Sequence, residues 1–573
     1  MAPKSRAVQP DFVFLSYAPN QNRKSQAIQD TQRRAHAARK SHAIARQRRA
    51  VPETSSSDDG SSSASPESPS NQQLETASSN EILVGKSTEV VEETHTILLN
   101  DDHDERQPVF RNDQLQVWRS RNVSPNSPFL GQGNVDPFDA FAEKGLPPYV
   151  FKVLDIAADM KWGHLKPSVL NQRSNPLKRA WLRANMESPA VLHAMVYGML
   201  VSLDSIQSPV DPTNTLGLKH QTFAMNLLQK ELRTLGDGTP HQNLLLAVIT
   251  LAAHGEPVRG QYIPPLGYPE SPLAKTQNLH IYGQMRLAPE HTHAIFMILE
   301  RLGGIEAVTL YGLRDTVEFC DLYFATRFGT SPRLPYRHPI YPLIPDIEYV
   351  PDSKAEHILL KSVRSLVTLP TLAFSESYME VIGMACVLLA GLDQYLRETA
   401  SAPSLPSLVR ARSVFQHRLT SLQPVDMAVA VFDEQVREIC RVTLLIFSNM
   451  VFFPLPHVSG VNTRLVTSLR HSISITGDEI LLQNLEMMTW VLMIGGIAAF
   501  PTEHRSWFVS TFRHNLLWHA NDWKEVEGIL EAHLWWDYCC EDAGKIFWKE
   551  VHAAHRSTGL AGDEIVLPFY GPP

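Results

Sequence analysis

The residues best suited to do chemistry are nine basic side chains within residues 21–50, a stretch that holds a single acid, Asp30. Lysine and arginine neutralise nucleic-acid phosphates and release their bound counterions. A helix of about 30 residues is about 45 Å long, which is enough to follow a DNA groove. The pattern predicts direct DNA contact or, alternatively, a nuclear-import signal alone. The nine residues are Arg23, Lys24, Arg33, Arg34, Arg39, Lys40, Arg46, Arg48 and Arg49.

A second candidate is the acidic run DDHDE at residues 101–105. Carboxylates one helical turn apart can hold Mg²⁺ against a diphosphate, and the run resembles the DDxx(D/E) motif of terpene synthases, which are all-α enzymes. That chemistry needs a rigid helix beside an apolar cavity, whereas this run lies in an acidic stretch. The second metal motif of those enzymes is missing, because Asn521-Asp522 lacks the Ser/Thr and Glu that should follow. We predict a solvated charge run, with a terpene-synthase-type enzyme as the remote alternative.

The other sequence motifs are incomplete. GKS at residues 85–87 would need a glycine where Asn80 stands, and GQG at residues 131–133 is followed by Asp136 instead of the third glycine of a dinucleotide fingerprint. HExxH, GxSxG and CxxC do not occur. We therefore predict no catalytic residue, no metal site and no cofactor. One histidine and cysteine cluster fits no structural zinc module; it consists of His519, His533, Cys539 and Cys540.

Cysteine usage and hydropathy indicate the compartment. An odd, scattered set of five cysteines argues against a disulfide framework and for a reducing compartment. The opening MAPKSR has no apolar stretch, so secretion is not expected. The longest apolar run, Met487 to Phe500, is shorter than the about 20 residues that cross a bilayer. We predict that this run is a buried helix and that the protein has no membrane partner.

The composition divides the chain into three regions. Residues 1–50 form a basic arm, residues 51–125 an acidic and Ser-rich linker predicted to be disordered, and residues 126–573 an all-α domain. In the third region apolar residues recur at helical spacing, as in Ile295, Ile298, Leu299 and Leu302 before the stop signal Gly303-Gly304. Similar stripes start at Val317, Val436 and Trp523, and Leu244 to Ala253 is apolar on all sides. The predicted fold class is therefore all-α, with a large helical domain after the arm and linker.

Several blocks follow one another in a fixed order between residues 133 and 551. They are GNVDPF at 133–138, HTHAIFMILERLGGI at 291–305, FCDLYFATRFGTSPRLP at 319–335, EICRVTLLIFSN at 438–449, and the Trp-rich stretches 490–509 and 523–551. Together they resemble the fungal-specific transcription factor domain, the regulatory region of many zinc-cluster regulators. The resemblance implies a nuclear regulator of RNA polymerase II transcription, acting on genes such as a metabolic or secondary-metabolite set. It also implies a homodimer or pairing with a partner transcription factor.

The sequence departs from that family at its N-terminus. The better-known members carry six cysteines there that bind two zinc ions, and this chain has no cysteine before Cys320. DNA contact is therefore expected through the basic arm and not through zinc. The alternative is a co-regulator that binds no DNA and acts through a DNA-bound partner. The C-terminal tryptophans are predicted to be core residues, with a partner-binding face as the alternative.

Overall fold

The computed structural model describes most of the chain after residue 139. All described residues belong to one of the two compact units of the chain. The basic arm, the acidic linker and the first block of the resemblance lie outside the described residues. The described ranges are 140–165, 175–206, 215–235, 238–258, 268–287, 289–337, 339–368, 375–516 and 522–558.

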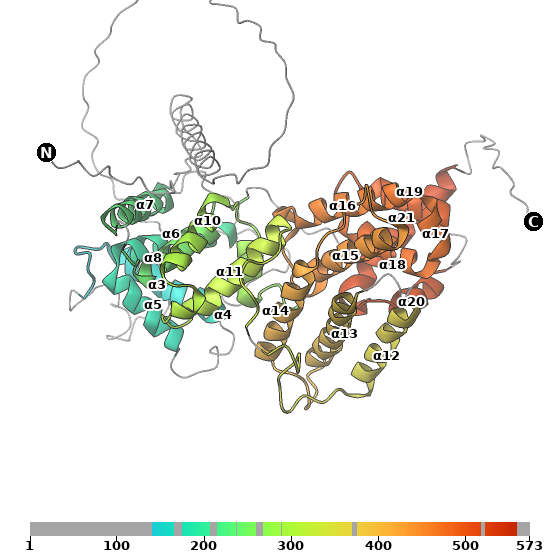
Figure 1. Ribbon diagram of the computed structural model, residues 1–573, viewed down its shortest axis with the longest axis horizontal. Coiled ribbons are helices and arrows are strands. Elements are labelled where there is room, and N and C mark those ends of the chain that lie inside the picture. The colour runs from blue at the N-terminus through green and yellow to red at the C-terminus, as the bar shows by residue number, and fades with distance from the viewer. Residues whose placement is uncertain are drawn as a thin grey trace, which may run out of the picture. The chain divides into compact units, whose positions relative to one another are not determined.

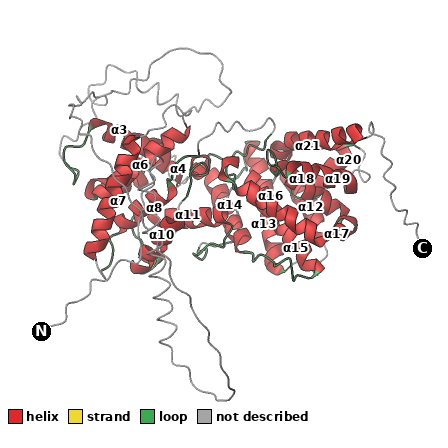
Figure 2. Ribbon diagram, turned by 90° about the horizontal axis from the view of Figure 1, so that it is seen from above, coloured by secondary structure: helices red, strands yellow, loops and turns green. Residues whose placement is uncertain are grey.

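The described part is all-α, as predicted from the sequence: it is 72% helical and contains no strand (Figure 2). Its first elements are drawn in cyan to green in Figure 1. They are α3 (Pro148–Ile156), the π-helix η1 (Ala157–Trp162), α4 (Gly163–Leu165), α5 (Pro176–Glu187), α6 (Pro189–Ile206), α7 (Thr215–Leu235), α8 (Gln242–Ala253), the 3₁₀ turn η3 (Thr276–Asn278), α9 (Leu279–Tyr282), α10 (Pro289–Arg301), η4 (Ile305–Ala307) and α11 (Leu313–Phe328).

The remaining elements run from yellow to red in Figure 1. They are α12 (Ser353–Thr368), α13 (Glu376–Leu396), α14 (Leu405–Ser421), α15 (Phe432–Val451), η5 (His457–Ser459), α16 (Val461–Thr476), α17 (Asp478–Gln483), α18 (Leu485–Ala498), α19 (Arg505–Leu516), α20 (Trp523–Glu531) and α21 (Asp537–Thr558).

Local sequence signals explain where several helices begin and end. Asn175 caps α5, since its side chain accepts a hydrogen bond from the Lys178 amide at 3.1 Å, and Pro176 follows at the first helical position. Helix α11 ends at Gly329, which adopts a left-handed φ of 70° that favours glycine. The apolar helices α8 and α18 have no polar face, and nearly every residue in them is buried.

The predicted apolar stripes coincide with α10, α11, α15 and α20. The α15 stripe is fully buried, and Gly303 and Gly304 after α10 have φ angles of 95° and 90°, so this stop signal is confirmed. The stripe that starts at Trp523 continues at helical spacing to Leu534, which predicts a longer helix; this boundary is wrong, because α20 ends at Glu531. Leu534 is nevertheless buried, because the chain turns back into the core directly after the helix.

One hydrophobic cluster joins the described helices, from Phe141 to Val551. The C-terminal tryptophans Trp535, Trp536 and Trp548 are buried within it, whereas Trp507 and Trp523 are partly buried. The predicted core role therefore holds for three of these side chains, and the alternative of a partner-binding face does not fit them. Met487 to Ala498 are all buried in α18, which confirms the predicted buried helix.

Helix α13 is long and apolar enough to cross a membrane by length and composition alone. In the structure it contacts α12 and α14, and 67% of its most apolar window is buried among the described residues. The core helix of a water-soluble protein has the same features.

Candidate functional site

All nine predicted DNA-contact residues, Arg23 to Arg49, lie outside the described residues, as does the acidic run at 101–105. Their roles stay predictions. The five cysteines, in contrast, are all described; each is free and buried, in agreement with the expectation that they form no disulfide framework. Within the described ranges, no group of three or more histidine, cysteine or acidic side chains could hold a metal ion.

The structure draws attention to a lysine that the sequence did not single out, Lys161. It lies in the π-helix η1, between α3 and α4, and its side chain is buried. Such π-turns often occur at functional sites. One sequence signal could have found it: Lys161 stands four residues after Ala157 and four before Leu165, so it occupies an apolar stripe where a charged residue is unusual.

Among the described residues, Lys161 contacts only neutral groups. Its Nζ contacts Ser202 Oγ and His254 Nε2 at hydrogen-bond distance, and the Gly198 carbonyl oxygen at 3.4 Å. The Nδ1 of His254 lies 2.6 Å from the Thr250 carbonyl oxygen. A carbonyl only accepts, so Nδ1 carries the proton and Nε2 presents a lone pair to the lysine.

The helix α6 leaves room for this histidine at Gly198. A Cβ atom there would lie 3.1 Å from the His254 ring and 3.1 Å from Thr250 Cγ2. A larger residue would therefore push the ring away from Lys161, so glycine suits this position for close packing.

Burial sets the charge of the site. It lowers the pKa of Lys161 to about 7, because the ammonium ion loses its hydration and gains no carboxylate in exchange. The pKa of His254 lies well below its ordinary value, first through burial and second through the charge of Lys161. The ammonium also lies 5.1 Å from the centre of the Tyr282 ring. Near neutral pH, a sizeable fraction of Lys161 is thus an uncharged amine with a lone pair.

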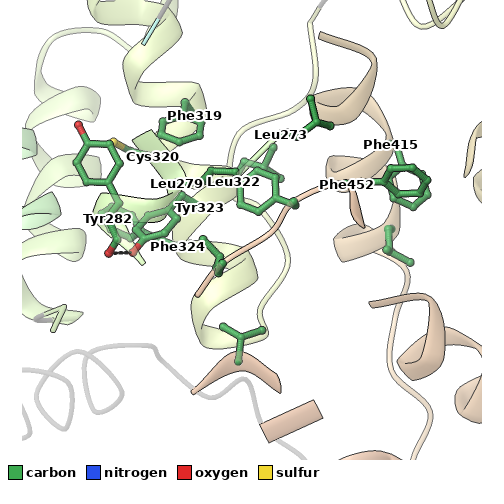
Figure 3. Packing of buried hydrophobic residues seen from close by; sticks show 14 of the residues in the cluster. Leu273, Leu279, Tyr282, Phe319, Cys320, Leu322, Tyr323, Phe324, Phe415 and Phe452 are labelled. Atoms are coloured by element: carbon green, nitrogen blue, oxygen red, sulfur yellow. Dashed lines mark hydrogen bonds between the residues drawn. The ribbon is translucent and has the colours of Figure 1, made fainter. Parts of the chain in front are cut away.

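Lys161 and His254 line a small apolar cavity of about 30 Å³. That volume holds about two water molecules. Tyr282 and the α11 side chains Phe319, Cys320 and Tyr323 form part of the wall. Figure 3 shows these four side chains within the hydrophobic cluster, where the Tyr323 hydroxyl donates to the Tyr282 carbonyl oxygen at 2.7 Å. The rest of the wall comes from Ala157, Trp162, Leu165, Trp181, Met195, Gly198, Met199, Leu246, Ile249, Thr250, Ala253 and Thr316.

The π-helix is fixed by two residues in an unusual conformation. Gln277 and Asn278 have φ angles of 51° and 58°, which non-glycine residues rarely adopt, and both are buried. Asn278 Nδ2 donates to the Lys161 carbonyl oxygen at 3.1 Å, and Gln277 Nε2 donates to the Leu165 carbonyl oxygen at 3.4 Å. Such a conformation costs about 1 to 3 kcal/mol for each residue. Its effect here is that both side chains hold the backbone of the segment that carries Lys161.

A second buried cation, Arg412, contacts the same turn at Thr276 and Gln277. Arg412 on α14 is 0% exposed, donates to Thr276 Oγ1 at 2.6 Å and contacts Gln277 Oε1. Its guanidinium lies 5.1 Å from the centre of the Phe453 ring, and burial lowers its pKa to about 9. Arg412 thus connects α14 to the turn at residues 276–278, which in turn holds the backbone at Lys161.

A larger cleft of about 450 Å³ adjoins the lysine cavity. It is lined by α11, α14 and the loop at 334–345, and it shares Leu165 and Phe319 with the cavity. One lining side chain ties α11 to this loop, because the Asp321 carboxylate accepts hydrogen bonds from the backbone amides of Arg333 and Leu334 at 2.8 to 3.1 Å. Leu165 and Phe319 therefore separate an open cleft from the buried amine.

A different polar chain joins α3, α6 and α7. His193 Nε2 lies 2.9 Å from a Glu143 carboxylate oxygen, the two Nδ1 atoms of His193 and His220 lie 2.8 Å apart, and His220 Nε2 lies 2.8 Å from the Tyr149 hydroxyl. A histidine pair in such contact shares one proton and resists a second. Burial and then the neighbouring His193 lower the pKa of His220 to about 4.

This pair predicts acid sensitivity. In the unfolded chain His220 binds a proton near its ordinary pKa of 6.5, but in the folded protein only near 4. Its contribution to the free energy of unfolding is therefore complete above pH 6.5 and is lost as the pH falls towards 4. We expect a loss of about 2 kcal/mol from this group, allowing for solvent screening. Urea unfolding at pH 7 and pH 4.5 measures it, and the fall should be smaller by that amount in His220→Gln. An equal fall in both proteins would contradict the assignment.

No protein-family model, no curated protein and no solved structure matches this chain.

Proposed function

We propose that this protein is a nuclear transcription regulator in which the basic arm contacts DNA and the helical domain is regulatory. The observation that carries the proposal is the charge pattern, with nine basic residues against one acid in residues 21–50. Phosphate neutralisation needs such a density of positive charge and no fixed fold. The sequence blocks that follow one another between residues 133 and 551 resemble the fungal-specific transcription factor domain. This resemblance supports a regulatory role for the helical domain.

The helical domain would supply contacts with other proteins, either a second copy of the chain or a partner transcription factor. Its all-α core leaves several apolar side chains on the surface, for example Val429 and Val431 just before α15, which are 80% and 65% exposed. Exposed apolar residues are common on monomers, so Val429 and Val431 do not distinguish a second copy of the chain from a partner transcription factor.

A co-regulator without DNA contact is the second candidate, and one observation favours it. The first cysteine is Cys320, so the six-cysteine zinc module of the resembling family has no counterpart in the N-terminal residues. Base readout needs side chains held against base edges, and a basic arm alone supplies affinity with little discrimination. A DNA-bound partner would then choose the target genes.

Chromatin occupancy of the intact protein, compared with a variant lacking residues 1–50, separates the two functions. The variant carries an added import signal so that both proteins enter the nucleus. If the arm contacts DNA, the occupancy peaks should disappear in the variant although its nuclear level is unchanged. Peaks that persist at the same genes would support the co-regulator, and the absence of peaks in the intact protein would contradict both functions.

A further inference from the structure

We propose that Lys161 is a nucleophilic amine that forms a reversible imine with a small aldehyde inside the apolar cavity, with His254 accepting the proton. The inference goes beyond transcription regulation and does not depend on the basic arm, since it concerns only helices α6, α8 and α11 and the π-helix η1. It assigns a covalent ligand site of a stated chemical class, a one- or two-carbon aldehyde.

The hydrogen bonds around Lys161 are those that an activated amine needs. A nucleophile is activated by a base within hydrogen-bond reach, and that base is oriented by a third group. Here the base is His254, oriented by the Thr250 carbonyl through a 2.6 Å contact that leaves the Nε2 lone pair facing Lys161. Of the three contacts of Nζ, the one with the Gly198 carbonyl is the longest at 3.4 Å. When the ammonium ion becomes an uncharged amine, it can lose the proton directed at the Gly198 carbonyl and keep its hydrogen bonds with Ser202 and His254.

The surroundings favour the uncharged amine over the ammonium ion. The cavity wall is largely aliphatic and aromatic, and all three partners of Nζ are neutral. With its pKa lowered to about 7, Lys161 at pH 7 is uncharged in about half of the molecules, whereas an ordinary exposed lysine is uncharged in roughly one in 3000. Exclusion of water also slows hydrolysis of an imine once it has formed.

The size of the cavity limits the partner. About 30 Å³ admits about two water molecules or a similarly small carbonyl compound. A larger carbonyl would have to displace Leu165 or Phe319, the two residues that also line the open cleft. These two side chains are therefore the entry to the site, and short aldehydes are the class that fits without rearrangement.

The reaction balances without an oxidant or reductant. The Lys161 nitrogen lone pair attacks the aldehyde carbon, and the carbonyl π electrons move to the oxygen. One amine proton passes to His254 Nε2 and from there to the oxygen, which gives the neutral carbinolamine. The nitrogen lone pair then expels the hydroxyl, and the remaining N–H proton passes through His254 Nε2 to complete the water that leaves, so that a neutral C=N bond remains. Hydrolysis follows the same steps in reverse.

Reductive trapping tests the inference on the full-length chain. The protein is incubated at pH 7 with acetaldehyde and sodium cyanoborohydride, which converts an imine into a stable ethylated lysine, and the modified peptides are quantified by mass spectrometry. Lys178 is the internal reference, because it is partly exposed and lies in an ion pair with Asp159 at 3.0 Å. We expect Lys161 to be labelled at least about a hundredfold faster than Lys178, in line with its larger uncharged fraction. Labelling of Lys161 that is absent, or no faster than that of Lys178, would overturn the proposal.

Two variants separate the roles of the two side chains. Lys161→Met should abolish labelling in the peptide that contains residue 161 and leave Lys178 unchanged. His254→Gln keeps a hydrogen-bond acceptor beside Nζ but cannot carry a proton, so the labelling rate of Lys161 should fall by at least about tenfold and its rise with pH should change. An unchanged rate and pH profile would overturn the assignment of His254 as the base. Circular dichroism verifies folding, and the ratio of Lys161 to Lys178 in the unaltered protein needs no variant. DNA binding has no part in this measurement, so it can fail while the proposed function stands.

Discussion

Replacing Gly255 with alanine is expected to lower the free energy of unfolding by about 3 kcal/mol or more. A Cβ atom at this position would lie 1.6 Å from the Arg286 carbonyl oxygen and 2.7 Å from its carbonyl carbon. Both are backbone atoms, so no side chain can turn aside. The segment after α8 would have to separate from residues 284–286 and lose the hydrogen bonds Val258 N to Gln284 O and Arg286 N to Glu256 O, of 2.8 and 2.9 Å. Urea unfolding of the two proteins measures the change.

The matched control for this substitution is Gly528→Ala in α20. A Cβ atom there would meet no atom within 4 Å. Alanine is the better helix former by about 0.5 to 1 kcal/mol, so this variant should be as stable as the unaltered protein or slightly more stable. Equal destabilisation of both variants would contradict the close contact at Gly255. The Gly255 variant should also move its neighbour His254, which connects the stability of this turn to the environment of Lys161.

The second large effect concerns DNA affinity. If about five of the nine basic charges engage phosphates, the logarithm of the association constant should fall with the logarithm of the salt concentration at a slope of roughly −4 to −5. Affinity for a generic duplex should then drop several hundredfold between 50 and 200 mM salt. Fluorescence anisotropy over a salt series measures the slope. Seven substitutions to alanine should abolish this binding and impair nuclear entry; they are at Arg33, Arg34, Arg39, Lys40, Arg46, Arg48 and Arg49.

A control for charge uses the exposed basic residues of α7, Lys219, Lys230 and Arg233. Their replacement by alanine lowers the positive charge of the helical domain and should leave affinity and slope unchanged. If the arm variant binds DNA as before and the α7 variant does not, the DNA contact lies on the helical domain. If neither variant changes the affinity, the arm is not the DNA contact and the co-regulator becomes the better proposal.

The helices could be predicted from the sequence because their signals are local. A stripe such as Val436, Ile439 and Cys440 repeats within one turn, and a glycine such as Gly329 marks a helix end through its own φ angle. Leu534 shows the limit of such patterns: it continues the spacing of α20 after the helix has ended, because a side chain can be buried by the turn that follows.

The candidate site could not be predicted in the same way. Lys161 and His254 are 93 residues apart in the sequence, and nothing local to either residue indicates that they touch. The left-handed conformations of Gln277 and Asn278 are imposed by tertiary contacts, since neither residue has the conformational freedom of glycine. Of these residues, only Lys161 has a signal in the sequence, as a basic residue on an apolar stripe. That signal is weak, because the charged end of such a lysine more often lies in water.

The hydrogen bonds that join the early and late helices bear on how the chain folds as it is synthesised. Ser271 Oγ donates to the carbonyl oxygen of Val451 at 2.6 Å, across 180 residues, and Asn462 reaches the Tyr268 hydroxyl across 194 residues. A ribosome adds about 5 to 20 residues per second, so the first partner waits roughly 10 to 35 s for the second. During that interval the apolar faces later covered by α14 to α16 are open to solvent. We therefore expect the nascent chain to expose these apolar surfaces until translation has passed Asn462, near the start of α16.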